Sequence, residues 1–224
     1  MPSVKIARKS TDTDMTPFVD VAFLILAFFM LATKFKPPDP VEITTPNSVS
    51  SDALEQKDGI LVQLDKDGRV FFAMQTDVNR EAKRVVIENL NKTRNLGLTP
   101  AEMSNFEKAY AIGVPFNQLK QFLALDDEGQ KKVKQPGIPV KDSATNELYY
   151  WVRDAVTAFA GTGSKISYLI KGDNAAKYPD FKRVLEAFKR NDIYKFQLVT
   201  SPESAPPGTE LYKTRQGGPK PAAN

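Results

Sequence analysis

The sequence predicts an α+β fold in which one N-terminal transmembrane helix is joined by a linker to a small α/β domain with a helical insertion. Three observations support this prediction. One uninterrupted run of nineteen mostly apolar residues lies near the N-terminus. Two β-prone runs are joined by an Asp-Lys-Asp-Gly turn at residues 65–68. A strand, helix and strand pattern occupies residues 165–200.

The apolar run covers residues 15–33 and, as a helix, would be about 28 Å long, close to the roughly 30 Å hydrocarbon core of a bilayer. Thr16 is expected to cap this helix. Pro17 suits its first turn, where the missing amide hydrogen costs nothing. We therefore expect a transmembrane helix at residues 15–36, preceded by a cytoplasmic N-terminus at residues 1–14.

A cleaved signal peptide is the alternative interpretation, because Lys5, Arg8 and Lys9 precede the apolar run. The run lacks a small-x-small cleavage site and contains an aspartate, which favours a retained anchor. The same short basic segment favours a cytoplasmic N-terminus, with the rest of the chain on the other side of the membrane.

Asp20 is the only ionisable residue within the apolar run. An ionised carboxylate in the middle of a transmembrane helix costs about 2.5 to 3.5 kcal/mol on insertion scales. Protonation removes that charge, whereas a polar cavity in a partner protein would solvate the charged carboxylate. Alternation between the neutral and the charged form could therefore carry protons. The alternative is that Asp20 lies near the cytoplasmic end and is simply hydrated. Because one helix cannot enclose a proton path, the first interpretation requires a partner membrane protein.

The folded domain is expected at residues 59–200, after an extended linker at residues 37–58 and before a flexible tail at residues 201–224. At its start, the runs at 60–64 and 69–73 should form a hairpin. Further elements are expected near its end: a strand at 165–171, an amphipathic helix at 179–190 and a strand at 195–200.

Residues 76–161 form a largely helical insert in this prediction, with helices at 77–95, 99–110, 116–125 and 147–160. Thr99 and Glu102 have the spacing of a capping box. The aromatic run at residues 149–151 allows ligand binding or core packing, and core packing is favoured because large aromatics at helical spacing usually fill cores. The basic run at residues 131–134 is interpreted as a solvated loop.

Composition excludes several kinds of chemistry. The chain has no His and no Cys. This excludes a zinc site of Cys and His, a Ser-His-Asp triad and a cysteine nucleophile. We therefore expect no enzyme activity and no metal or cofactor. The net charge of +4 comes from the two ends of the chain, since 23 basic and 23 acidic residues lie between Lys36 and Ala205. A nucleic-acid-binding face is not expected on a neutral body.

Two segments carry a family resemblance. Residues 14–21, with the sequence DMTPFVDV, resemble the N-terminal signature of the ExbD/TolR family. Residues 166–173, Tyr178 and residues 196–200 resemble the C-terminal half of the ExbD periplasmic domain. The middle of the domain is longer than in an ordinary family member.

The resemblance implies a function and partners. In this family the aspartate after the Thr-Pro pair is the protonatable residue, which corresponds to Asp20. The protein would form a dimer within a ring of ExbB/TolQ-type channel subunits in the inner membrane of a Gram-negative bacterium. Its periplasmic domain would act on a TonB-type periplasm-spanning protein, with protons as the coupling ion and biopolymer transport as the outcome.

Two alternatives remain open at the level of the sequence. One is a TolR-like role in envelope integrity, although no amphipathic helix follows the last expected strand, which favours the ExbD-like role. The other is a membrane-tethered module that binds the cell wall or another envelope protein, in which Asp20 has no ion-carrying role.

Overall fold

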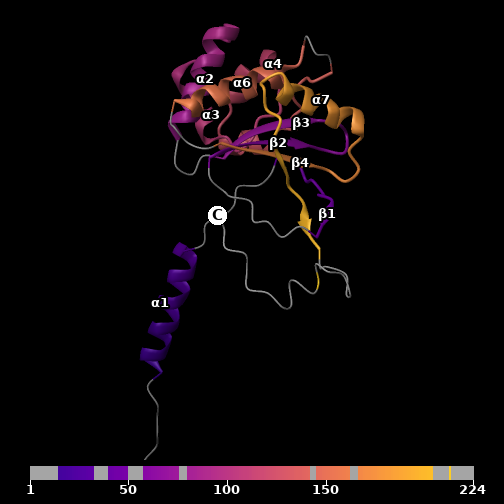
Figure 1. Ribbon diagram of the computed structural model, residues 1–224. Helices are drawn as coiled ribbons and strands as arrows, with labels where there is room; N and C mark the ends of the chain where they lie inside the picture. Colours follow the sequence, from indigo (N-terminus) through magenta and orange to yellow (C-terminus); the bar gives the residue numbers. More distant parts are fainter. Residues whose placement is uncertain are drawn as a thin grey trace, which may run out of the picture. The chain divides into compact units, whose positions relative to one another are not determined.

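The computed structural model describes residues 15–32, 40–49, 58–75, 80–141, 145–161, 166–203 and 212. The chain divides into two compact units, Met1–Pro37 and Pro38–Asn224, which are described separately. Within the described ranges of the first unit there is one helix, α1 (Thr16–Ala32) (Figure 1). None of the described helices meets the combined requirements of length and apolar character for crossing a membrane.

The start of α1 differs by one residue from the expected cap. The helix begins at Thr16, and the Val19 amide donates a hydrogen bond to the Met15 carbonyl at 3.0 Å. Met15 rather than Thr16 therefore occupies the cap position, since the cap carbonyl accepts the first intrahelical bond. Pro17 lies in the first turn, where its missing N–H leaves no helical bond unmade.

The second unit contains a four-stranded mixed sheet with the strand order β3-β2-β4-β5. Its strands are β2 (Gly59–Leu64), β3 (Val70–Gln75), β4 (Ser167–Gly172) and β5 (Gln197–Leu198). β2 pairs antiparallel with β3 and parallel with β4, and β4 pairs parallel with β5. The expected α+β class, hairpin and C-terminal strand-helix-strand unit are confirmed. β5 is shorter than the predicted strand at 195–200.

The turn between β2 and β3 shows why the sequence Asp-Lys-Asp-Gly forms a hairpin. The Asp65 side chain accepts hydrogen bonds from the Asp67 amide at 2.9 Å and from the Arg69 amide at 2.7 Å. The Arg69 Nε donates to the same carboxylate at 2.6 Å. Gly68 has φ +79°, a backbone conformation that glycine adopts without steric cost.

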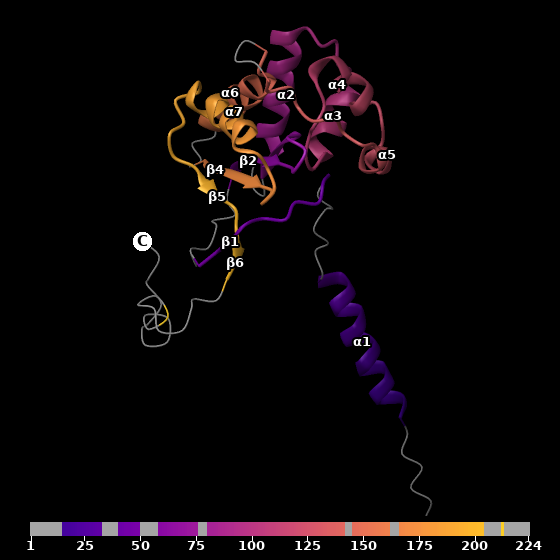
Figure 2. The same ribbon diagram turned by 90° about the vertical axis from the view of Figure 1, so that its right-hand side faces the viewer.

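Three helices cover one face of the sheet, as Figures 1 and 2 show: α2 (Arg80–Arg94), α6 (Glu147–Ala160) and α7 (Tyr178–Lys189). Their shared core is centred on the fully buried Trp151, whose ring stacks on Phe72 at 5.3 Å and on Phe106 at 5.6 Å. Core packing is thus confirmed for Trp151. Tyr149 and Tyr150 are only half-buried.

The insert is helical, as predicted, and also contains α3 (Pro100–Lys108), α4 (Phe116–Leu123) and α5 (Asp127–Lys132). The expected capping box opens α3, since the Thr99 amide donates to Glu102 at 2.7 Å and the Glu102 amide donates to Thr99 at 3.3 Å.

The prediction of a loop at residues 131–134 is wrong for Lys131 and Lys132. Lys131 and Lys132 form the last turn of α5, which starts where the Asp126 side chain accepts a hydrogen bond from the Gly129 amide at 2.9 Å. The error has a physical reason, because a helix of six residues is too short to show an apolar period.

The insert also covers the outer edge of β3. Phe72 and Ile112 exchange two backbone hydrogen bonds of 2.8 Å, and the Ile138 amide donates to the Val70 carbonyl at 2.8 Å. α3 therefore ends at Lys108 rather than near residue 110, because the chain must extend to reach β3.

A second, two-stranded sheet joins the expected linker to the expected tail. β1 (Asn47–Ser48) pairs parallel with β6 (Ser201–Pro202) (Figure 2). The prediction of a flexible tail from residue 201 is thus wrong for its first two residues, and part of the predicted linker is paired. The two strands lie at opposite ends of the domain sequence, so local sequence patterns could not predict that they pair. Residues 50–57 and 204–211 lie outside the described ranges.

Candidate functional site

Asp20 lies in the second turn of α1, and its neighbours on the helix are apolar or uncharged. Thr16, Phe23 and Ala27 lie on the same face at helical spacing. α1 contains no Lys or Arg, so the helix itself offers the Asp20 carboxylate no cation. Met15, Thr16, Val19 and Phe23 surround Asp20 on this face.

The side chains of α1 are exposed on all sides of the helix. No residue of α1 is buried, and Phe18 and Phe23 are both 70% exposed. Apolar surface of this extent is unfavourable in water by roughly 25 cal/mol per Å². The helix therefore requires an apolar environment or a partner.

Asp20 is the one ionisable residue of α1, and a carboxylate can take up and release a proton. Acid–base and covalent catalysis use a second acid, base or nucleophile, and within α1 no second ionisable side chain accompanies Asp20. Among the residues with described positions, no group of three or more acidic side chains could hold a metal ion. Thr16 and Pro17, the two residues predicted to support the helix start, are the first two residues of α1.

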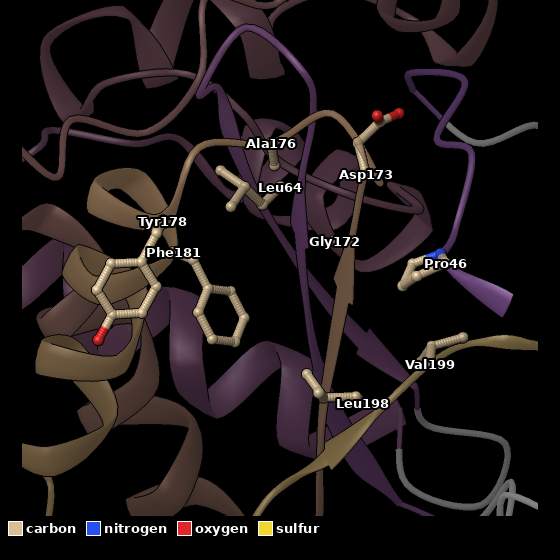
Figure 3. Close-up of a pocket in the computed structure, with 9 residues that line it drawn as sticks. All are labelled: Pro46, Leu64, Gly172, Asp173, Ala176, Tyr178, Phe181, Leu198 and Val199. Carbon is tan, nitrogen blue, oxygen red and sulfur yellow. The ribbon is translucent and has the colours of Figure 1, made fainter. Parts of the chain in front are cut away.

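A second candidate site is an apolar groove of about 260 Å³ in the folded domain (Figure 3). It lies where β2 and β4 end and α7 begins. Its lining consists of Pro46, Leu64, Gly172, Asp173, Ala176, Tyr178, Phe181, Leu198 and Val199. Tyr178 is 71% exposed and Leu198 is 53% exposed, so the rim of the groove is open to solvent.

The acid in this lining, Asp173, has a structural role. Its carboxylate accepts hydrogen bonds from the Thr44 amide at 3.0 Å and from the Ala175 amide at 2.8 Å. Figure 3 shows the carboxylate pointing away from the apolar side chains. The groove is therefore suited to receiving apolar side chains rather than to performing chemistry.

Among the described residues, no strand pairs with the outer edge of β5, the last strand in the order β3-β2-β4-β5. The amides of Val199, Ser201 and Glu203 donate to the Ile170, Pro46 and Ser48 carbonyls, at 2.9 to 3.0 Å, and so point toward β4 and β1. Since strand residues alternate, the amides of Leu198 and Thr200 point to the opposite edge. Sequence reasoning missed this edge, because a strand as short as β5 has no local pattern that reports its place in the sheet.

Comparison with known proteins supports a family assignment. The family described as "Biopolymer transport protein ExbD/TolR" matches residues 7–203. This range includes α1 with Asp20, the groove and both sheets. No curated protein and no solved structure matches the chain.

Proposed function

The chain belongs to the ExbD/TolR family of biopolymer transport proteins, and from that premise we propose that it is the proton-carrying subunit of an inner-membrane motor of the ExbB-ExbD type. The motor uses the proton motive force to energise TonB-dependent outer-membrane transport. Asp20 is the proton carrier, and protons are the coupling ion.

The observation that carries the proposal is the isolation of Asp20 in an otherwise apolar, wholly unburied helix. We propose that α1 is inserted in the inner membrane within a ring of ExbB/TolQ-type channel subunits. Its seventeen residues extend over about 26 Å, most of the roughly 30 Å hydrocarbon core. A polar cavity in the ring solvates Asp20 when it is charged, and protonation allows it to face apolar surroundings.

The energy available to such a cycle is sufficient for a mechanical step. A charge that crosses the full membrane potential releases about 2.3 kcal/mol per 100 mV. Successive protonation and release at Asp20 can therefore bias the motion of α1 in one direction. The N-terminus is cytoplasmic and the domain with the two sheets is periplasmic, where it acts on a TonB-type protein.

We expect Asp20→Asn to abolish transport while membrane insertion and partner binding persist. The amide keeps the shape and polarity of the side chain but cannot cycle between charged and neutral forms. The measurement is growth on a TonB-dependent nutrient, in a strain that lacks its own ExbD-type subunit. Asp12→Asn, which changes an acid outside both α1 and the signature at residues 14–21, is the matched control.

Three outcomes of this test would count against the proposal. Growth of the Asp20→Asn strain at the wild-type rate would show that Asp20 is merely tolerated. Loss of the protein from the membrane would show that Asp20 is needed for insertion instead. Rescue of a TolR-deficient strain, without rescue of the ExbD-deficient one, would assign the chain to the TolR-like role.

A further inference from the structure

A short segment that precedes β2 is fastened to the end of the domain sequence. We call residues 44–48, which include β1, the arm. β1 pairs in parallel with β6, and Figure 2 shows the two strands side by side. The Ser201 amide donates to the Pro46 carbonyl at 3.0 Å, and the Glu203 amide donates to the Ser48 carbonyl at 2.9 Å. The arm is thus tied to the residues that follow the last strand of the main sheet.

Further polar contacts hold the start of the arm. The hydroxyl oxygens of Thr45 and Ser201 are hydrogen-bonded at 2.6 Å. The Thr44 amide donates to the Asp173 carboxylate at 3.0 Å, and the Thr44 carbonyl accepts from the Asn174 amide at 2.8 Å. The arm is therefore attached both to β6 and to the loop that follows β4.

This attachment is much less buried than the main sheet. β1 and β6 have two residues each, and none of the four is buried, whereas every residue of β2 is buried. Hydrogen bonds that water can reach contribute little net stability, because water replaces them when they open. Segments with few buried apolar contacts also open before the core does. The β1–β6 pair can therefore separate while the main sheet stays folded.

Separation would lengthen the chain that joins α1 to the domain. Twelve residues lead from Ala32, the end of α1, to Thr44, where the arm is attached. Twenty-six residues lead from Ala32 to Asp58, whose carbonyl accepts a hydrogen bond from the Ser167 amide beside the main sheet. At about 3.3 to 3.6 Å per residue, these lengths reach at most about 40 Å and about 90 Å.

The arm also forms one wall of the apolar groove. In Figure 3, Pro46 and Val199 lie on one side of the groove, and Tyr178 and Phe181 lie on the other. Separation of the arm would remove Pro46 from this lining. The same event that lengthens the tether would therefore widen the groove.

Building on the function proposed above, we propose that the β1–β6 pair is a releasable clasp. When closed, it holds the domain on a short tether and narrows the groove. When open, it roughly doubles the reach of the domain from α1 and frees the groove. Because the arm lies between α1 and β2 in the chain, a pull from α1 acts on the clasp before it reaches the main sheet. Transport requires the clasp to open.

A disulfide across the clasp tests this requirement. The chain has no native cysteine, and the contact between the Thr45 and Ser201 side chains suits a bond between two sulfur atoms. We expect the double variant Thr45→Cys and Ser201→Cys, once oxidised, to grow on a TonB-dependent nutrient no better than the Asp20→Asn strain. A reductant should restore its growth. Each single variant, which cannot form the bond within one chain, should grow like the wild type.

Hydrogen exchange of the purified full chain in nanodiscs tests the clasp without a transport assay. We expect the amides of residues 201–203 to exchange at least about 100-fold faster than those of residues 60–64 in β2. If the reduced double variant fails to grow, this exchange measurement decides.

Equal exchange of the two segments, no disulfide under oxidant, or wild-type growth of the oxidised double variant would overturn the clasp. The Asp20→Asn experiment tests the proposed function separately. Loss of growth in Asp20→Asn together with wild-type growth of the oxidised double variant would reject the clasp alone.

Discussion

Asp20 and Asp65 show how surroundings give the same side chain different roles. Asp65 is 1% exposed, and its carboxylate is engaged by three donors of the β2–β3 turn. It is committed to holding the hairpin. Asp20 lies on a helix without cations and among exposed apolar side chains. The sequence alone distinguishes the two, because one aspartate begins a Gly-containing turn and the other interrupts an apolar run.

At the same scale, Glu147 predicts a dependence of stability on pH. Burial raises the pKa of Glu147, and the hydrogen bond from the Phe116 amide and the charge of Arg94 act against this increase. The folded state thus binds this proton more tightly than the unfolded state. Its contribution to stability is complete below the ordinary pKa and is lost as the pH rises through the raised value.

Glu147→Gln should therefore gain stability relative to the wild type as the pH rises from about 4 to about 7, because the amide stays neutral throughout. Urea unfolding of the full chain in detergent, followed by Trp151 fluorescence, measures the difference at each pH. Glu203→Gln, which changes an exposed side chain, is the control. A difference that stayed constant, or reversed, between the two pH values would contradict the assignment.

Among the elements, the segment between α3 and α4 closes the outer edge of β3 and requires a glycine. A Cβ added at Gly113 would overlap the Phe71 ring. The Gly113 amide also donates a hydrogen bond to the Gln135 side chain. Gly113→Ala should lower the free energy of unfolding by about 1 to 3 kcal/mol, as overpacking does in dense cores. Gly172→Ala is the matched control, since no atom lies within 4 Å of its added Cβ. Equal stability of the two variants in urea would show that this contact is not tight.

The elements found from the sequence are those with a local cause. The hairpin follows from its turn, α3 from its capping box, and α7 from the apolar spacing of Val184 and Phe188. The missed elements depend on distant partners: β1 needs β6, and the bridge at Ile112 needs Phe72. The packing of Arg94 of α2 on the Tyr150 ring of α6 was missed for the same reason, because neither segment of the sequence reports the other.

For the whole molecule, the family resemblance predicts that α1 works as a close pair inside a ring of partner subunits. Phe23, Ala27 and Met30 continue the face of Asp20 at heptad spacing, and the chain has no native cysteine. Cysteine at one or more of these positions should give disulfide-linked dimers in an active complex, as seen on non-reducing gels. Cysteine at Phe29, on the opposite face, should give fewer. Monomers at all four positions would rule out a paired helix.

The measurement that tests the central role of Asp20 most directly is proton entry into proteoliposomes that contain this chain and an ExbB-type partner. An imposed membrane potential drives the protons, and a pH-sensitive dye inside the vesicles reports them. We expect the wild-type complex to admit protons and the Asp20→Asn complex, assembled to the same size, to admit none above the lipid background. Proton entry at the wild-type rate through the Asp20→Asn complex would contradict the account.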